Sequence, residues 1–314
     1  MNKNGGTEGV TAVVAGQHGR RQFLVLPRWF TSDHPLPWLA PLFALIAAFG
    51  LYPLGYALWL TLNQRNPYTR EMEWSGLDQW ARALGDERMW NALMVTSIYT
   101  VVCLLVQVVL GFVIALLLDS ERPGYGVLRA LMTLPLVVPP AVTGLMFLLM
   151  EDAQFGVLAY YLDVVGLADP SQPILGNIYT ALPGVMLADI WQWTPFMVLI
   201  ILAGLRALPK EPYEAAAIDG ASYLQSLWYL TLPMLGRVVA VAVLIRTIDL
   251  FRIYDYIYTM TTGGPGTATE TLSFYAGREF TTANFNYAST LSLITLILLN
   301  VVCFLFIRVS RVKF

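Results

Sequence analysis

Long apolar stretches alternate with shorter polar ones along most of the 314-residue chain. A helix needs roughly 20 mainly apolar residues to cross the hydrocarbon core of a bilayer. Stretches 38–62, 92–118, 130–150, 183–204 and 287–307 meet this requirement with at most one charged residue each, and 238–260 is equally long but contains several charges. The pattern predicts an all-α integral membrane protein with six transmembrane helices in a domain over 38–314, preceded by a polar tail over 1–37.

The composition agrees with lipid as the solvent for most of the chain. Hydrophobic residues make up 57% of the sequence and charged residues 13%, whereas about a quarter of the residues in soluble domains are charged. The net charge of -2 and the lack of a basic patch give no sign of a nucleic-acid partner. Cys103 and Cys303 lie inside apolar stretches, so we expect them to be buried hydrophobic residues and predict neither a disulfide nor a metal site.

The distribution of Lys and Arg predicts the orientation of the spans. Cytoplasmic loops of membrane proteins carry an excess of these residues. If the N-terminus is inside, most cations fall in the inner segments, and the outer loops hold only Arg65, Arg70, Arg82, Arg88 and Arg278. Both termini and the 211–233 connection are therefore predicted to be cytoplasmic. The loops at 63–91, 151–182 and 261–286 are then outside, and we expect short helices in the last two.

The third predicted span contains three prolines within six residues, namely Pro135, Pro139 and Pro140. Proline removes a backbone donor and kinks or breaks a helix. In membranes such a break is tolerated where neighbouring groups satisfy the freed backbone. The trio predicts a bent third span, whereas the single Pro53 and Pro195 are as compatible with ordinary membrane helices.

The fifth predicted span combines a long apolar sequence with a charge at every third position: Arg246, Asp249, Arg252 and Asp255. Residues three apart are neighbours on a helix surface, so each arginine can pair with an acid on either side. One charge at the centre of a membrane helix costs about 2.5–3.5 kcal/mol on the insertion scale. We therefore expect these side chains to face protein or water rather than lipid.

The fourth span runs the opposite way and contributes Asp189, Gln192, Trp193 and Phe196. At a rise of about 1.5 Å per residue, Gln192 and Trp193 are expected at the depth of Arg252, and Phe196 near Asp249. Ring faces beside hydrogen-bonding groups suit a neutral polyhydroxyl ligand. Two alternatives stay open. The charges could form an internal ion-pair network that holds the helices together, and Trp191 and Trp193 could belong to an aromatic belt at the outer interface.

The connection over 211–233 has the pattern of a helix–turn–helix. Glu211-Pro212 suits a helix start, since proline is favoured in the first turn and an acid stabilises the positive end of the helix dipole. Gly220 suits a helix end in the left-handed conformation. A second helix is predicted from Ser222 to Leu230, with Pro233 ending the unit.

This connection resembles the EAA signature of ABC importer permeases. The matching residues are Glu214-Ala215-Ala216, Gly220, Leu230 and Leu232-Pro233, and the one departure is Leu230, where the family usually has isoleucine. The neighbouring IWQWTPF and TTGGPGTATE sequences are similar to those of the carbohydrate branch, the maltose and glycerol-phosphate permease type. The resemblance runs from residue 38 to the end of the chain and implies the type I ABC importer permease fold.

The resemblance implies that 211–233 contains a coupling helix that docks onto a cytoplasmic ATPase. The residues implied in this contact are Glu214, Ala215, Ala216, Asp219, Gly220, Leu230 and Pro233. The chain has no G-x-x-x-x-G-K-[ST] phosphate-binding loop. ATP and Mg would therefore bind to the separate ATPase, and this chain would be a transport subunit without a cofactor or an enzyme activity of its own.

The family's assembly implies further partners: a second homologous permease in a heterodimer, two ATP-binding cassette subunits and an extracytoplasmic solute-binding protein. It also implies a location in the cytoplasmic membrane of a bacterium or archaeon. The sugar-contacting positions of the maltose-type permease correspond here to Asp189, Gln192, Trp193, Phe196, Arg246, Asp249 and Ile253, and the depth argument adds Arg252. Because this set is more charged than in the maltose type, we expect a carbohydrate other than maltose, moved by alternating access.

Three functions other than a carbohydrate ABC permease are alternatives for this sequence. A proton- or sodium-driven secondary transporter would use Asp249 or Asp189 as the titrating group and would need no ATPase. An intramembrane enzyme is disfavoured because both histidines, His18 and His34, lie in the N-terminal tail. An ABC permease for another polar solute, such as an amino acid or a polyamine, differs only in its cargo.

Overall fold

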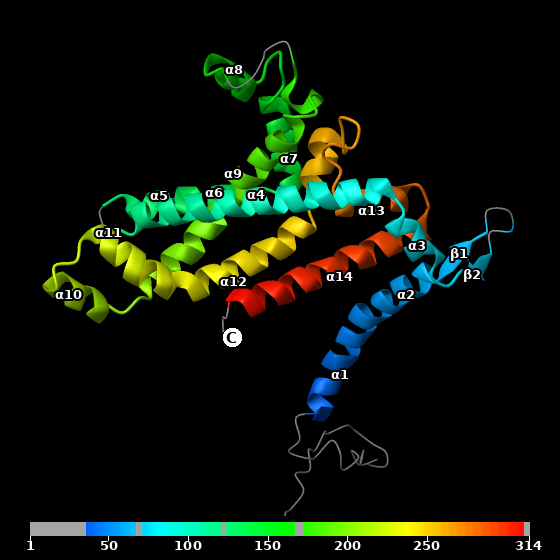
Figure 1. Cartoon of the computed structure of the whole chain (residues 1–314), viewed down its shortest axis with the longest axis horizontal. Helices are drawn as coiled ribbons and strands as arrows, with labels where there is room; N and C mark the ends of the chain where they lie inside the picture. Colours follow the sequence, from blue (N-terminus) through cyan, green and yellow to red (C-terminus); the bar gives the residue numbers. More distant parts are fainter. Residues whose placement is uncertain (1–35, 67–68, 70, 121–122, 167–171, 311–314) are drawn as a thin grey trace, which may run out of the picture. The chain divides into compact units, whose positions relative to one another are not determined.

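The computed structural model describes residues 36–66, 69, 71–120, 123–166 and 172–310 (Figure 1). The chain divides into two compact units, residues 1–53 and 54–314. The predicted tail over 1–37 lies almost entirely outside the described residues. The first unit contributes α1 (Leu36–Ile46) and η2 (Ala47–Leu51), and α2 (Tyr52–Thr61) continues the helix into the second. Trp38–Thr61 is long and apolar enough to cross a membrane.

In the part of the chain that the structure describes, four further helical stretches are long and apolar enough to cross a membrane. They are Glu87–Leu118 (α4), Ala181–Arg206 (α9), Tyr223–Phe251 (which contains α12, Leu232–Phe251) and Phe285–Ser310 (α14). A broken pair, Tyr125–Val137 and Pro140–Met150, passes the same test as one span. The six predicted spans are confirmed, with the third one bent.

The bend in the third span lies where the prolines predict it. α5 (Tyr125–Met132) and α6 (Leu134–Val137) precede the break, and α7 (Pro140–Met150) follows it at an angle of 96°. Val138 has an extended backbone, because the residue before a proline avoids the helical conformation. Pro139 and Pro140 then supply no N–H to the carbonyls of the preceding turn.

Short elements connect the spans. The predicted outer loop over 63–91 contains an antiparallel hairpin, β1 (Asn63–Arg65) with β2 (Met72–Trp74), and α3 (Asp78–Leu84). The described residues are therefore helical apart from one small sheet. The predicted short helices of the other two outer loops are α8 (Val157–Val164), near η3 (Ile174–Gly176), and α13 (Leu272–Thr281). The remaining elements are α10 (Glu211–Ile218), α11 (Tyr223–Ser226), η4 (Leu227–Thr231) and η5 (Ile257–Thr261).

The predicted bounds of the fifth span, 238–260, are wrong at both ends. The helix is continuous from Tyr223, and it stops at Phe251. Its end is fixed by hydroxyl groups from the beginning of α13: Ser273 donates to the carbonyl of Phe251 (3.0 Å), and Thr271 donates to the carbonyl of Ile253 (3.1 Å). These bonds satisfy carbonyls that a longer helix would have paired internally.

α4 and α9 form the centre of the second unit. A Cβ atom on Gly111 would lie 2.6 Å from the Cβ of Met197, so glycine is what lets the two helices approach this closely. Buried apolar side chains from both helices continue into clusters with α7, α12 and α13, among them Tyr99, Phe147, Val185, Leu250 and Leu272. The site described next lies within this packing.

Candidate functional site

A buried polar cluster joins α4, α9 and α12 at the middle of their packing. Arg246 of α12 forms an ion pair with Asp189 of α9, and these side chains are 2% and 0% exposed. Gln107 of α4 completes the cluster: its Nε2 donates to Asp189 Oδ1 (2.7 Å), and its Oε1 accepts from Arg246 Nε (2.9 Å). The two buried charges of this cluster therefore neutralise each other, as burial demands, although Asp189 Oδ2 has no hydrogen-bond partner among the described residues.

A second row of contacts leads from this ion pair to the break in the third span. The guanidinium of Arg246 lies 4.6 Å from the ring centroid of Trp193, a cation–π contact. The indole N–H of Trp193 donates to the hydroxyl of Tyr256 (3.2 Å), which in turn donates to Gln192 Oε1 (2.5 Å). Gln192 Nε2 donates to the carbonyl of Val138 (2.5 Å), so the polar cluster gives this backbone carbonyl at the break a hydrogen-bond partner.

The structure places the predicted pathway residues in two groups. Asp189, Gln192, Arg246 and Ile253 are buried inside the chain, whereas Trp193, Phe196 and Asp249 are half-buried and Arg252 is exposed. Trp193 and Phe196 pack edge to face with ring centroids 6.1 Å apart. The half-buried and exposed members are the ones that a ligand could reach without displacing other side chains.

The predicted pairing of charges along the fifth span differs from the observed one. Arg246 pairs with Asp189 of another helix, and in the described residues no ion pair involves Asp249, Arg252 or Asp255. The helix ends before Arg252, so the spacing of three residues no longer keeps these side chains on one face. The expected depths also change, because Trp193 lies against Arg246 and Tyr256.

Two members of the cluster were not among the predicted site residues. Gln107 is the one amide in the apolar 92–118 stretch, and a lone amide in a membrane helix is a signal that could have identified it. Tyr256 carried no such signal, because it reaches Gln192 only after the chain has left the α12 helix.

Replacing Gln192 by leucine is expected to destabilise the second unit. The change leaves the Val138 carbonyl and the Tyr256 hydroxyl without their partner, and an orphaned buried group costs about 1–3 kcal/mol. Thermal unfolding of the solubilised chain should show a lower midpoint. Tyr256→Phe is the comparison, because it keeps the bond to Val138 and should cost less. Equal losses in the two variants would argue against the role of Gln192 at the helix break.

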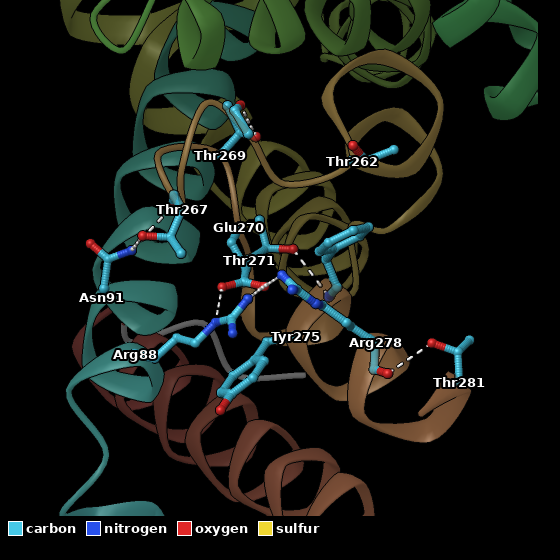
Figure 2. Close-up of polar contacts among 12 residues, drawn as sticks. Arg88, Asn91, Thr262, Thr267, Thr269, Glu270, Thr271, Tyr275, Arg278 and Thr281 are labelled. Carbon is cyan, nitrogen blue, oxygen red and sulfur yellow. Dashed lines mark hydrogen bonds and ion pairs between the residues drawn. The ribbon is translucent and has the colours of Figure 1, made fainter. Parts of the chain in front are cut away.

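The Gly/Pro-rich loop before α13 is held by a second polar cluster at the predicted outer end (Figure 2). Glu270, 1% exposed, accepts from Arg88 Nε (2.6 Å) and Nη2 (2.8 Å) of α4. Arg278 of α13 approaches the same carboxylate at 3.5 Å. Asn91 Nδ2 donates to the carbonyl of Thr267 (3.0 Å). The loop thus has a fixed position relative to α4 and α13.

Replacing Glu270 by glutamine should weaken this attachment while keeping the shape of the side chain. Hydrogen bonds to charged groups contribute about 1.5–3 kcal/mol, and Glu270 loses the charge that holds two arginines. The unfolding midpoint should fall measurably. Glu87→Gln, an exposed acid in the first turn of α4, is the matched control and should change it little. A midpoint unchanged in Glu270→Gln would contradict the proposed attachment.

The 211–233 connection folds as predicted in its first half. α10 has Pro212 in its first turn and ends at Ile218, and Gly220, two residues later, has a left-handed φ of 77°. Ala221 N donates to Ala216 O (2.9 Å) and Gly220 N to Ala217 O (3.2 Å), the bonds of a Schellman motif. In the second half the prediction is wrong: Pro233 does not end a separate helix. It comes just after the π-helical turn η4 and lies inside the continuous helical stretch Tyr223–Phe251.

This connection presents an exposed surface at the end of the second unit opposite α13 (Figure 1). Its exposed apolar side chains are Ile218, Tyr223, Leu224, Trp228 and Tyr229. Glu214, Ala215, Asp219, Gly220 and Pro233 are exposed, whereas Ala216 and Leu230 are half-buried. A cavity of about 770 Å³ lies beside it, lined in part by Lys210, Glu214 and Tyr223. So much aromatic surface on one connection is typical of a protein–protein contact.

Comparison with known sequences assigns a family to these features. The model of the family described as "Binding-protein-dependent transport system inner membrane component" matches residues 107–312. The trehalose/maltose transport system permease protein MalF of Thermococcus litoralis is 33% identical over 88% of this chain and 92% of its own length. The trehalose transport system permease protein SugA of Mycobacterium tuberculosis is 34% identical over 86% of each chain.

Two further similarities agree with this family. The sn-glycerol-3-phosphate transport system permease protein UgpA of Agrobacterium fabrum is 31% identical over 84% of this chain and 90% of its own. A solved chain of a bacterial ABC transporter involved in alginate import superposes with a TM-score of 0.76 at 19% identity, covering 90% of this chain and 98% of that one. This structural likeness confirms the predicted type I permease fold.

Proposed function

Because the chain belongs to the binding-protein-dependent transport system inner membrane component family, a group of multi-pass membrane proteins, we propose that it is the permease subunit of an ATP-driven importer for a carbohydrate. The observation that carries this proposal is the exposed helix–turn connection around Gly220, which offers a docking surface to a separate ATPase. The sugars in the names of MalF and SugA support a carbohydrate as the cargo.

The proposed complex contains further subunits. Two ATP-binding cassette subunits bind ATP and Mg, and α10 docks onto one of them. A second homologous permease completes the pathway, so this chain provides half of it, and a solute-binding protein delivers the sugar to the outer loops. A structural neighbour forms a complex with a periplasmic protein bound to an alginate pentasaccharide, which supports such a delivery step. The assembly lies in the cytoplasmic membrane of a bacterium or archaeon, with both termini inside.

The proposed sugar pathway uses the reachable members of the predicted set. Trp193 and Phe196 offer ring faces, and Asp249 and Arg252 offer charged hydrogen-bonding groups. Asp189, Gln192, Arg246 and Ile253 are buried and take part by positioning these side chains: Arg246 lies against the Trp193 ring, and Gln192 is bonded to Tyr256, which accepts from Trp193. A ring face beside acceptors and donors matches the two sides of a sugar.

The decisive experiment is ATP-driven uptake by the complete importer in proteoliposomes, with a panel of mono- and disaccharides and sugar derivatives and with the solute-binding protein present. We expect uptake of a carbohydrate, together with ATP hydrolysis stimulated by that sugar. Uptake of an amino acid or a polyamine in place of sugars would show that the cargo is not a carbohydrate, while the chain would still be an importer permease. Transport without any ATPase would overturn the proposed mechanism itself.

A further inference from the structure

Glu151 is a buried carboxylic acid without a hydrogen-bond partner in the described part of the chain. It caps the C-terminal end of α7 and is 1% exposed. Neither Oε1 nor Oε2 has a partner among the described residues. The large majority of buried polar side chains are hydrogen-bonded, so a carboxyl group with two orphaned oxygens is exceptional. Neither the sugar pathway nor the ATPase contact makes use of it.

The carboxyl group lies between α7 and the first turn of α9. A Cβ atom on Gly184 would be 2.5 Å from Glu151 Oε2 and 3.0 Å from Leu175 Cδ2, so the glycine leaves the space that the carboxyl group occupies. Leu175 belongs to η3, and Phe147 and Val185 continue the apolar surroundings on both sides. A side chain at 184 would displace the Glu151 carboxyl group and the end of the Leu175 side chain.

Among the described residues, no cation forms an ion pair with Glu151. The described elements around it, α7, α8, η3, η5 and the first turns of α9, contain no Lys, Arg or His. Their titratable groups are Tyr160, Tyr161 and Asp163 of α8 and Tyr258 of η5, all outside the buried contact with Gly184. The first acid of α9 is Asp189, which is already paired with Arg246. The adjacent Asp152 accepts from the backbone of Gln154 (2.9 Å).

We propose that Glu151 is a proton-binding site, which holds the outer end of α7 against α9 while it carries the proton and releases this contact when the proton leaves. A neutral carboxyl group can stay in an apolar site at the cost of unmade hydrogen bonds. An unpaired carboxylate there is far more costly and draws in water or moves out. The bound proton therefore controls how tightly the predicted outer ends of the third and fourth spans pack.

The direction of the pH effect follows from burial. Burial raises the pKa of Glu151 from 4.5 to about 7, and no other group contributes to the change. The unfolded chain ionises this group near 4.5, so its contribution to folding is complete below that pH. It is lost progressively as the pH rises through about 7. The closed contact is then the form favoured at acidic pH and the loosened one the form favoured at alkaline pH.

Infrared difference spectroscopy of the full chain in lipid tests the site without reference to transport. The carbonyl band of a protonated carboxylic acid should be present at pH 5.5, fall with an apparent pKa of about 7, and be missing in Glu151→Gln. Asp163→Asn, which removes a half-buried acid of the same loop, is the matched control and should keep the band. A band that does not change between the wild type and Glu151→Gln would overturn the proposal.

Transport measurements then test the consequence, and this part rests on the proposed function. Above the apparent pKa the protonated fraction of Glu151 falls roughly tenfold per pH unit, so uptake by the wild-type importer should change in the same range. Glu151→Gln should make uptake independent of pH above the apparent pKa. Glu151→Met, which also removes the ionisable group and fills the same site, is the second test if the glutamine variant does not fold. If both variants keep the wild-type pH profile, the proton has no control over transport. If no cargo is transported, the proposed function fails while the infrared result still stands.

Discussion

Replacing Arg246 by leucine is expected to prevent stable folding of the second unit. Asp189 would be left at a position with no exposure, with Gln107 as its remaining side-chain partner. Removing one partner of a buried ion pair costs about 3–5 kcal/mol, because the remaining charge is uncompensated. The stability of a domain is about 5–15 kcal/mol in total, so this loss is a large share of it. Fluorescence-detected size exclusion and thermal unfolding of the solubilised chain would show the loss directly.

The matched variant removes both charges together. Asp189→Leu combined with Arg246→Met fills similar volumes without leaving a charge, and well-packed apolar replacements of buried pairs are often neutral in stability. We expect this double variant to regain most of the folded population. Its transport activity then separates two roles: recovery of folding without transport would show that the ion pair also positions Trp193 for the sugar. A stable Arg246→Leu single variant would contradict the burial argument altogether.

Replacing Gly220 by valine should uncouple ATP hydrolysis from transport while the chain still folds. A left-handed backbone costs a residue with a Cβ about 1–2 kcal/mol, and branching at the Cβ restricts it further. In the described part of the chain no atom lies within 4 Å of a Cβ added to Gly220, so the loss comes from the turn itself and not from crowding. Since a tenfold change corresponds to about 1.4 kcal/mol, sugar-stimulated hydrolysis in the complete importer should fall roughly tenfold.

Gly166 provides a control with the same backbone conformation. Its φ is 73°, no atom of the described residues lies within 4 Å of a Cβ added to it, and it follows α8 in the loop that is predicted to be outside. Gly166→Val imposes the same strain but should leave hydrolysis coupled to transport. Equal effects of the two substitutions would mean that strain alone, and not the contact with an ATPase, explains the loss. Full activity of Gly220→Val would contradict a coupling role for this turn.

The elements that the sequence predicted correctly depend on local patterns. A run of apolar residues is enough to predict a span, because lipid forces every backbone group to pair within its own helix. Three prolines within six residues predicted the break before α7, and Gly220 predicted the end of α10. The helix start at Glu211 and the Schellman motif likewise follow from residues that are neighbours in the chain.

The elements that were missed depend on partners far away in the sequence. The end of α12 at Phe251 is set by hydroxyl groups of Ser273 and Thr271, which reach it only after the chain has folded back. The same fold-back brings Tyr256 to Gln192. Counting at 1.5 Å per residue assumes one straight helix, and it placed Trp193 beside Arg252 for that reason.

The sequence by itself determined that this chain spans a membrane several times, that the 211–233 connection contains a helix ending at a left-handed glycine, and which residues are costly enough in lipid to require a purpose. Only the tertiary structure decided that Arg246 pairs with Asp189 beside Gln107, that Asp249 is half-buried, and that Glu151 is buried with no hydrogen-bond partner for its side chain among the described residues. The physical reason is that burial and pairing are properties of neighbours in space. Chain spacing fixes such neighbours within a helix but not between helices.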